Sequence, residues 1–481
     1  MAYKHGTYQQ EGATAFQLPV VVDYGHFIVG MAPMHKVKQE KRSVNEVIRI
    51  GTYQEAIEYF GDIYDLDFSI SQAIKVFFEL YGVAPLYLVN ILDPQKHKTE
   101  KKTLTEQPLQ KGKYILSSQK VIPETVVIKE SIGKEVVADT RVVFTSEGLE
   151  IYAKLSGGTK IDIEYEEVDI SKVTKEDAIG GFDSNTMKRT GLELVNEVFL
   201  KYSELPSFLD VPDFSHLSEV AAIMETKAKS INGGMFEALA LINAPEDKKY
   251  DAIPDWKDSN NITSENEVLL YGKVGLAGKS YYHSLHYAAL SLKVDGENNG
   301  VPSQGPSNYS YKMDTLLWKN SQGHVKELRL DKEQQANFLN KNGVITAINF
   351  KGWRCWGSET SKNPLATDPK DKFVYTRRMF KYIGNELVIS YFNNVDKRFT
   401  LKMAETMEKS MNIRLNSLVA GNQLLSGKVA FYASDNSLID IINGDITWSI
   451  EIGIVPLAKS ITFKKIYDVA ALEAFASTIA K

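Results

Sequence analysis

The chain has 481 residues, a formal net charge of −5 and one cysteine, Cys355. The length allows about three or four domains, and 43% apolar with 24% charged residues is typical of a soluble globular protein. The charge argues against a general nucleic-acid binder, and one cysteine excludes an intrachain disulfide framework and a cysteine-rich zinc site. No signal-peptide or membrane-spanning pattern is visible, so we expect the protein to be made and assembled in the cytosol.

The first residues, 1–17, are polar and offer few side chains for a core, so we expect a free arm or an edge strand there. The apolar periodicity that follows predicts a compact α/β unit. Its expected elements are a strand over 26–33, a helix that Thr52 caps, a helix over 69–81 that ends at Gly82, and a strand over 85–92.

Residues 94–113 form a polar run rich in lysine. It could be a patch for anionic surfaces, but glutamates interleave and aromatics do not, which favours a solvated linker. Short β-branched segments separated by glycines over 114–170 predict a small inserted β-sandwich. Asp162, Glu164 and Glu166 share one strand face, where neighbouring carboxylates repel one another, so we expect an exposed face rather than a metal site.

Amphipathic helices alternate with apolar strands from about residue 181, which predicts a mainly parallel sheet with right-handed crossovers. The expected helices are 190–203 and 216–231, and the expected strands are 206–211 and 236–243. Asp210 and His216 are residue types of a serine-protease triad, but no serine lies in the context of an activated nucleophile. We therefore expect this domain to be inert.

The segment Gly272–Ser280 is the strongest sign of an enzyme. It ends in Gly-Lys-Ser, as phosphate-binding loops do, but five residues separate its glycines where the motif needs four. It also follows a helix-like segment, 265–271, rather than a clear strand. A cytosolic nucleotide-binding α/β enzyme using this loop is thus the alternative function.

Two histidines follow this loop at a spacing that suits one helix face. His283 and His286 could bind a metal ion, but no cysteine or carboxylate on that face completes a site. A cluster with the neighbouring tyrosines at the surface or at an interface is therefore favoured.

Residues 343–360 combine a predicted strand with two closely spaced tryptophans. The strand begins after Gly343, and the chain then continues as Gly352-Trp353-Arg354-Cys355-Trp356-Gly357. Tryptophan is a large apolar side chain with one N–H that needs a partner. A packed core corner is the favoured interpretation, and a ligand-stacking platform is the other.

Two helices and two strands are predicted beyond this stretch. The helices are 371–392 and one that Thr400 caps, and the strands are 446–454 and 460–467, on either side of Pro456. Met403, Met407 and Met411 form a stripe at helical spacing on the second helix. Such a stripe fills core gaps or forms a surface that must repack.

An apolar strand followed by Gly-Trp-Arg-x-Trp-Gly resembles the hallmark of contractile tail sheath proteins of phages and R-type bacteriocins. The family pattern continues with Arg-Thr, whereas this chain has Glu359 and then Thr360. The segment His5 to Glu11, the pair Arg377-Arg378 and the final Trp-strand-Pro-strand order are also similar to that family. The resemblance spans most of the chain and is weakest over 95–180.

The resemblance implies a mixed α/β multidomain fold. Its expected parts are an N-terminal arm (1–17), an N-terminal α/β domain (18–94), an inserted β-sandwich (95–180), a subtilisin-like α/β domain without a catalytic triad (181–345), a C-terminal α+β sheath domain (346–459) and a C-terminal arm (460–481). The implied function is that of a structural subunit, with no enzyme activity, cofactor or metal. It polymerises as stacked hexameric rings around an inner tube and contracts to drive that tube through a cell envelope.

The resemblance also implies which residues take part in assembly, with both arms adding strands to neighbouring subunits. The candidates are Thr7, Tyr8, Gln9, Gln10 and Glu11 in the N-terminal arm; Ile461, Phe463, Ile466 and Tyr467 in the C-terminal strands; Gly352, Trp353, Arg354, Trp356, Gly357 and Thr360 in the motif; and Lys402, Lys409 and Arg414 facing the tube. The implied partners are neighbouring sheath subunits, the inner tail tube protein, the baseplate and the tail terminator, with no nucleic acid and no membrane insertion. Assembly is expected in the host bacterial cytoplasm, and the subunit then belongs to the released phage tail or bacteriocin.

Overall fold

The computed structural model describes residues 24–61, 64–156, 158–320, 322–328, 330–331 and 335–480. The chain divides between Met411 and Asn412 into two compact units, which are described in turn. The expected N-terminal arm, including Thr7 to Glu11, lies outside the described residues. No helix in the described ranges is long and apolar enough to cross a bilayer.

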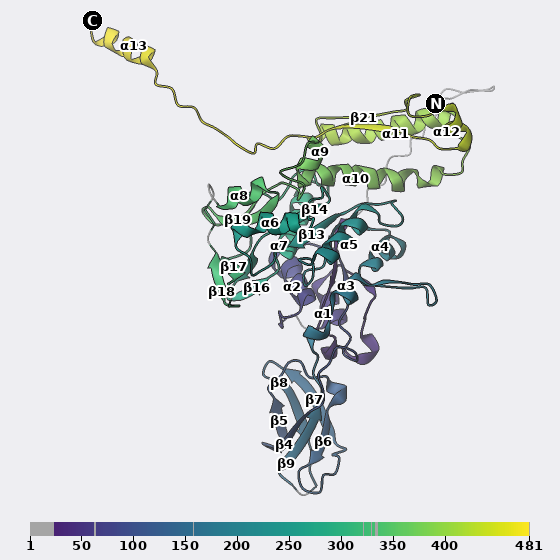
Figure 1. Ribbon diagram of the computed structural model, residues 1–481, viewed down its shortest axis with the longest axis vertical. Coiled ribbons are helices and arrows are strands. Elements are labelled where there is room, and N and C mark those ends of the chain that lie inside the picture. The colour runs from purple at the N-terminus through teal and green to yellow at the C-terminus, as the bar shows by residue number, and fades with distance from the viewer. Residues whose placement is uncertain are drawn as a thin grey trace, which may run out of the picture. The chain divides into compact units, whose positions relative to one another are not determined.

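An eight-stranded sheet forms the centre of the first unit (Figure 1). In spatial order its strands are β2 (Val47–Ile50), β3 (Leu86–Asn90), β1 (Tyr24–Gly30), β12 (Leu205–Asp210), β13 (Leu239–Asn243), β14 (Glu267–Leu270), β19 (Val344–Asn349) and β20 (Trp353–Trp356). The six inner strands run parallel, and β2 and β20 pair antiparallel at the two edges. The predicted parallel α/β pattern is confirmed.

The N-terminal strands belong to this sheet and do not form a separate one. β1 pairs in parallel with β12, with Tyr24 opposite Leu205 and Ile28 opposite Asp210. The expected separation of residues 18–94 from residues 181–345 therefore differs from the structure. The expected division after residue 345 falls inside β19, which is hydrogen-bonded to β14. Periodicity located these strands, but it carries no information on which strand pairs with which.

Helices cover both faces of the central sheet. Along β1, Ile28 belongs to one buried apolar cluster and Phe27 and Val29 to another, as the alternation of a strand requires. The helices of this unit are α1 (Tyr53–Phe60), α2 (Ser69–Ile74) with a π-helical continuation (Lys75–Tyr81), α3 (Lys175–Ile179), α4 (Val195–Tyr202), α5 (Ser218–Lys229), α6 (Ile253–Ser259), α7 (His283–Glu297), α8 (Asn337–Lys341), α9 (Pro369–Lys372) and α10 (Val374–Tyr391). The predicted cap is confirmed, because Thr52 and Glu55 form a reciprocal capping box at the start of α1.

The strand-rich insert contains two three-stranded sheets around a shared core. Their strands are β4 (Lys102–Pro108), β9 (Lys160–Tyr165) and β6 (Val127–Glu130) in one sheet, and β5 (Lys113–Leu116), β8 (Gly148–Ala153) and β7 (Thr140–Thr145) in the other. The lysine-rich run is part of this insert, because β4 pairs with β9. The expectation of a solvated linker over 94–113 is therefore wrong for its second half.

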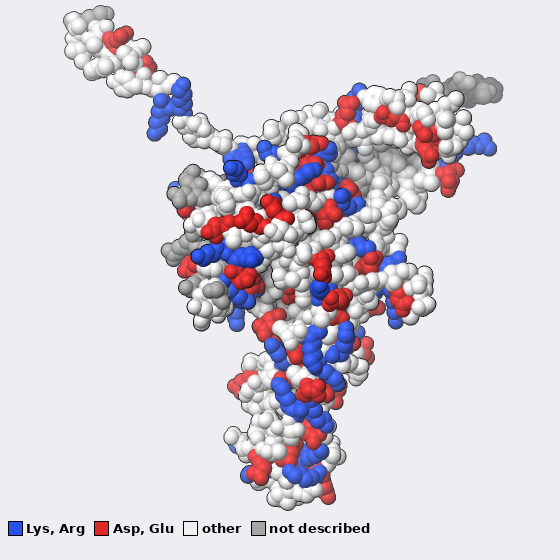
Figure 2. Space-filling view, viewed as in Figure 1, with Lys and Arg blue, Asp and Glu red and all other residues white. Residues whose placement is uncertain are grey.

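The three carboxylates of this insert are neutralised by lysines from neighbouring segments. Glu164 pairs with Lys101 at 2.8 Å and with Lys129 at 2.6 Å. Asp162 is buried, and its hydrogen bonds, that from Lys134 foremost, lower its pKa to about 2. The expected exposed acidic face is thus wrong. Blue and red residues interleave over the insert in Figure 2, so it presents no patch of one charge on this side.

Two smaller sheets complete the first unit. They are the hairpin β10 (Gly181–Asp183) with β11 (Lys188–Thr190), and a four-stranded sheet of β16 (Lys279–Tyr281), β15 (Lys273–Leu276), β17 (Thr315–Lys319) and β18 (Val325–Leu328). Helix α11 (Leu401–Ala420) crosses the division between the two units.

The second unit continues from α11 into a two-stranded antiparallel sheet. Its elements are β21 (Ser426–Ala430), α12 (Leu438–Asn443), β22 (Ser449–Gly453) and α13 (Val469–Ile479). β22 lies within the strand predicted over 446–454. The strand predicted over 460–467 is absent, because that segment pairs with no other strand in the described part of the chain.

Candidate assembly site

The glycine loop that carries the enzymatic alternative is a β-hairpin. β15 and β16 pair antiparallel around a turn at Ala277 and Gly278, and the other edge of β15 pairs with β17. The amides of such a ladder alternate in direction and are used within the sheet, so they do not converge on a phosphate. The prediction of a helix before the loop is also wrong, because β14 is a buried central strand.

The histidine pair lies in the core. His283 and His286 are fully buried in α7, so the expected surface or interface cluster is wrong. His283 Nδ1 is 3.0 Å from the Tyr271 carbonyl oxygen, and burial lowers the pKa to about 4 for His283 and about 3 for His286. Both imidazoles are therefore neutral at pH 7. Within the described ranges, no group of three His, Cys, Asp or Glu side chains could hold a metal ion.

The residues considered for a protease triad lie in different surroundings. Asp210 is fully buried at the end of β12, with its Oδ2 3.5 Å from Nε2 of His26. His216 instead lines a surface groove with Pro245 and Glu246. The imidazole paired with Asp210 is therefore His26, which the sequence did not single out.

The two tryptophans lie on the hairpin formed by β19 and β20. Three positions separate them on one strand, so Trp353 and Trp356 point to opposite faces and cannot form one stacking platform. Trp353 Nε1 donates to the Asp314 carbonyl at 2.9 Å, and Trp356 Nε1 donates to Asn337 Oδ1 at 3.2 Å. Both side chains pack against the same large core cluster, as the core-corner interpretation predicts.

The rest of the motif connects this hairpin to the following helices. Arg354 Nη1 donates to the Asn308 carbonyl at 2.7 Å. Thr360 is buried, and its hydroxyl donates to the Asp371 carbonyl at 2.5 Å. Glu359, which stands where the family pattern has arginine, is also buried, and its carboxylate accepts from the Ser358 amide at 3.0 Å.

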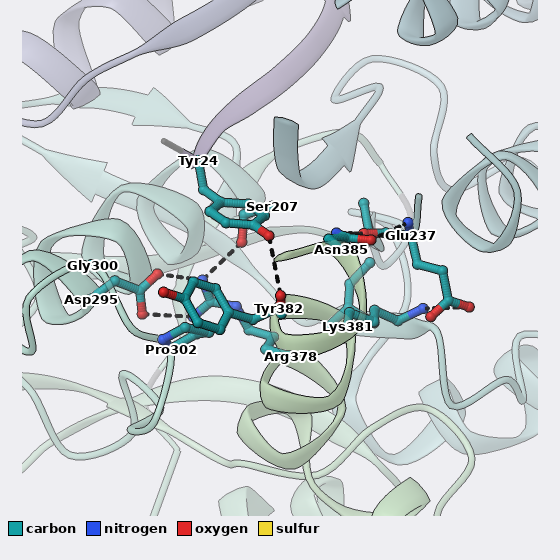
Figure 3. A pocket seen from close by; sticks show the side chains of 12 residues that line it. Tyr24, Ser207, Glu237, Asp295, Gly300, Pro302, Arg378, Lys381, Tyr382 and Asn385 are labelled. Atoms are coloured by element: carbon teal, nitrogen blue, oxygen red, sulfur yellow. Dashed lines mark hydrogen bonds and ion pairs between the residues drawn. The ribbon is translucent and has the colours of Figure 1, made fainter. Parts of the chain in front are cut away.

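Helix α10 is held against the N-terminal ends of the central strands by a buried ion pair. Arg378 donates to both carboxylate oxygens of Asp295 and, at 2.8 Å, to Ser207 Oγ at the start of β12 (Figure 3). Its guanidinium also lies 4.6 Å from the ring centre of Phe208. A bidentate, desolvated pair of this kind fixes orientation as well as position.

One helical turn further along α10, Lys381 is buried, and few polar groups offset the cost of burying its positive charge. Its Nζ lies 3.7 Å from Glu237 Oε1, and no hydrogen-bond partner is found for it in the described structure (Figure 3). Burial lowers the pKa of Lys381 to about 8. Asn385 secures the same contact, because it accepts from the Glu237 amide at 3.0 Å and donates to its carbonyl at 2.9 Å.

The candidate tube-facing residues do not share one face of α11. At about 100° per residue, Lys402 and Lys409 lie on the same side, whereas Arg414 lies about 120° away. Lys402 and Lys409 are exposed, and Lys409 Nζ is 3.9 Å from Glu405. The methionine stripe begins half-buried, with Met403 and Met407 lining a groove beside Tyr391.

The second unit presents unpaired strand edges. β21 and β22 pair only with each other among the described strands, with Ser426 opposite Gly453 and Ala430 opposite Ser449. A two-stranded sheet is marginally stable by itself and leaves two rows of backbone groups open to a further strand.

The C-terminal segment is exposed and largely irregular in the described part of the chain. Residues 458–480 are all exposed, and 454–468 contain no helix or strand. The apolar residues expected in strands are therefore uncovered, with exposures of 70% for Ile461, 85% for Phe463, 76% for Ile466 and 74% for Tyr467. The prediction of a strand is wrong for the single chain, and the predicted role in assembly stays a prediction.

No protein-family model matches this chain. It is 22% identical to the tail sheath protein of Burkholderia phage BcepMu over 481 residues, which cover 96% of each protein. It is 29% identical to the major tail sheath protein of Serratia phage KSP20 over 133 residues, 27% of this chain and 32% of that one.

This chain is similar to tail sheath proteins of phages over nearly its whole length. Solved sheath structures share its fold over nearly the whole length. The contracted sheath complex named PVC, from an extracellular contractile injection system, has a TM-score of 0.59 at 11% identity, covering 98% of this chain and 99% of that one. The contracted helical sheath of the anti-feeding prophage has a TM-score of 0.57 at 16% identity, covering 97% and 100%.

Most residues of the α10 contact carry no signal in the sequence. Arg378 was noticed as half of an Arg-Arg pair, but Asp295, Ser207 and Glu237 carried no signal because they come from distant segments. Lys381 did carry a signal in the sequence, because a lysine beside the apolar stripe of a long helix is a candidate for burial.

Gly357 tests the geometry of the tryptophan motif. It has φ +128°, and an added Cβ would lie 2.6 Å from Asn340 Nδ2 and 3.2 Å from Ile345 Cα. We expect Gly357→Ala to cost about 2 kcal/mol or more in the free energy of unfolding. Gly352→Ala is the matched control, because its φ is +108° but nothing lies within 4 Å of its added Cβ. Equal losses in denaturant unfolding would contradict this account.

Lys381 predicts a pH dependence of stability. Its folded pKa lies below its unfolded value, so between about pH 8 and 10.5 the unfolded chain binds more protons and this residue makes stability rise with pH. Lys381→Met should stabilise the protein at pH 7, by at most about 3 kcal/mol, and the gain should shrink towards pH 10. Thermal unfolding from pH 7 to 10 measures the difference between the two proteins. Lys402→Met, at an exposed lysine, should show no such gain, and a gain independent of pH at Lys381 would refute the assignment.

Proposed function

We propose that this chain is a contractile tail sheath protein, which polymerises as stacked six-membered rings around an inner tube and contracts to drive the tube through a cell envelope. The observation that carries the proposal is that the second unit contains both an open sheet edge and a segment that could add a strand to such an edge. An open two-stranded sheet is followed in sequence by residues 460–467, which are exposed and pair with no strand among the described residues. Each feature supplies what the other lacks when copies of the chain associate.

The segment 460–467 has the chemistry of an added strand. When the segment is extended, Ile461, Phe463 and Tyr467 share one face with Lys465, so that face is mainly apolar. Insertion beside β21 or β22 of a neighbour would satisfy backbone groups on both sides by β-augmentation. The N-terminal arm, 1–17, is proposed to add a strand in the same way. Links of this kind join subunits without fixing the angle between them, which a contracting lattice requires.

The energy of contraction is proposed to come from new contacts between subunits and not from nucleotide hydrolysis. The hairpin geometry of Gly272–Ser280 and the buried, neutral His283 and His286 support this. The docked helix α10 supports movement as rigid bodies, because its buried ion pair opposes bending within the subunit. The proposed partners are neighbouring subunits, the tube, the baseplate and the tail terminator, first in the host cytoplasm and then in the released particle.

The assembly role of the N-terminal arm can be seen directly. The purified full chain should form long hollow cylinders in negative-stain electron microscopy, and a chain lacking residues 1–17 should not. A chain with the same 17 residues in shuffled order is the matched control, and it should also fail if the arm acts through a specific strand. Small uniform particles from the unmodified chain would contradict the proposed function, and cylinders from the shortened chain would contradict the role of the arm.

The tube-facing surface is tested by charge reversal on α11. The double variant Lys402→Glu, Lys409→Glu should bind purified tubes of the same particle more weakly, at roughly 0.2–1 kcal/mol per contact in each subunit, and less so at high salt. Arg414→Glu is the control, because that residue lies on another side of the helix. Co-sedimentation measures binding, and cylinders formed without tubes report on self-assembly. Unchanged tube binding by the double variant would refute the assignment.

A further inference from the structure

Helix α12 in the β21–β22 connection carries an uncovered apolar face. The exposed fractions are 73% for Leu438, 70% for Ile439, 40% for Ile441 and 73% for Ile442. Ser437 and Asp440 form a capping box that defines the start of this helix. A tight cluster of exposed aliphatic side chains on an ordered element marks a contact surface.

Helix α13 at the end of the chain carries a second uncovered apolar face. Val469, Leu472, Phe475 and Ile479 are between 52% and 68% exposed and recur at helical spacing. Glu473, its single charged residue, lies outside that stripe. Isolated helices of this length are marginal in water, so α13 needs a partner to be stable.

We propose that α13 of one copy docks on α12 of a second copy, which rests on the proposed function and names the surface that receives the C-terminal arm. The direction in which an added arm strand would run places its end near α12. The Ala430–Ser449 end of the β21–β22 ladder leads into the connection that contains α12. An arm strand over 460–467 that runs antiparallel to β22, or parallel to β21, finishes at that end. α13 begins at Val469, directly after it.

The charges beside the two helices are complementary. Lys464 and Lys465 precede α13, and Figure 2 shows lysines next to a largely uncharged terminal helix. Asp435 and Asp445 flank α12 and are exposed. The basic arm therefore approaches an acidic border around an apolar centre, an arrangement that favours one orientation.

We assign the α12 that binds α13 to a second copy, because residues 460–467 do not pair with the β21–β22 hairpin of their own chain. After β22 ends at Gly453, a short turn would bring 460–467 back along the same strand. Residues 460–467 are instead exposed and pair with no strand in the described part of the chain. Residues 455–468, extended, span about 45 Å, which is enough to reach a neighbouring subunit.

Cross-linking tests the contact. Full-length proteins carrying Ile442→Cys and Leu472→Cys are mixed under assembly conditions and oxidised; the native Cys355 is buried and does not compete. We expect a disulfide-linked dimer from the mixture. Ala474→Cys, on the other side of α13, is the control and should give at least about tenfold less dimer with Ile442→Cys. Equal yields, or a bond formed within one chain of a dilute Ile442→Cys, Leu472→Cys double variant, would overturn the proposal.

Assembly thresholds separate this proposal from the proposed function. Phe475→Asp should raise the critical concentration for cylinders at least about tenfold, whereas Ala474→Asp, which adds the same charge on the other side of the helix, should change it less than about twofold. Adding Ile442→Lys to Phe475→Asp should restore part of the loss. An unchanged threshold for Phe475→Asp would overturn the docking and leave the sheath role intact. Failure of the unmodified chain to form cylinders would overturn the sheath role itself.

Discussion

The backbone groups at strand edges are the constraint on which this structure depends. In the first unit, the central sheet ends in antiparallel edge strands, and Arg354 of the outer strand bridges to Ser310 on its far side. In the second unit, β21 and β22 pair only with each other among the strands that the structure describes. Backbone hydrogen bonding therefore completes the edges of the central sheet in the first unit, whereas in the second unit it leaves strand edges to which a further strand could pair.

The first unit depends on pairing across a long insertion. β1 and β12 are neighbours in the sheet, although the whole strand-rich insert separates them in sequence. The insert has its own core and its own internal ion pairs, such as those of Glu164 with Lys101 and Lys129. It can therefore interrupt the sheet's sequence without interrupting its hydrogen bonding.

Helix α10 illustrates how polar groups fix one arrangement. Replacing a buried ion pair by apolar residues is often neutral for stability, but removing one member leaves an uncompensated charge. Arg378 with Asp295 thus specifies where α10 lies more than it adds stability. Lys381 lies near this pair with weaker compensation. The contact therefore combines a charge that is paired with both oxygens of a carboxylate and a second charge whose burial is costly.

The sequence by itself determined the order and type of the elements, because periodicity and capping are local. The helix capped by Thr52, the parallel strands from 206 onward and the strand before Trp353 all follow from patterns within a few residues. The tryptophan motif also carried the resemblance to tail sheath proteins. Only the tertiary structure decided which segments meet: β1 with β12, the lysines with Glu164, and Arg378 with Asp295. It also showed that Gly272–Ser280 is a hairpin and that 460–467 pairs with no strand among the described residues. A strand exists only where a partner satisfies its backbone, and no single sequence states where that partner is.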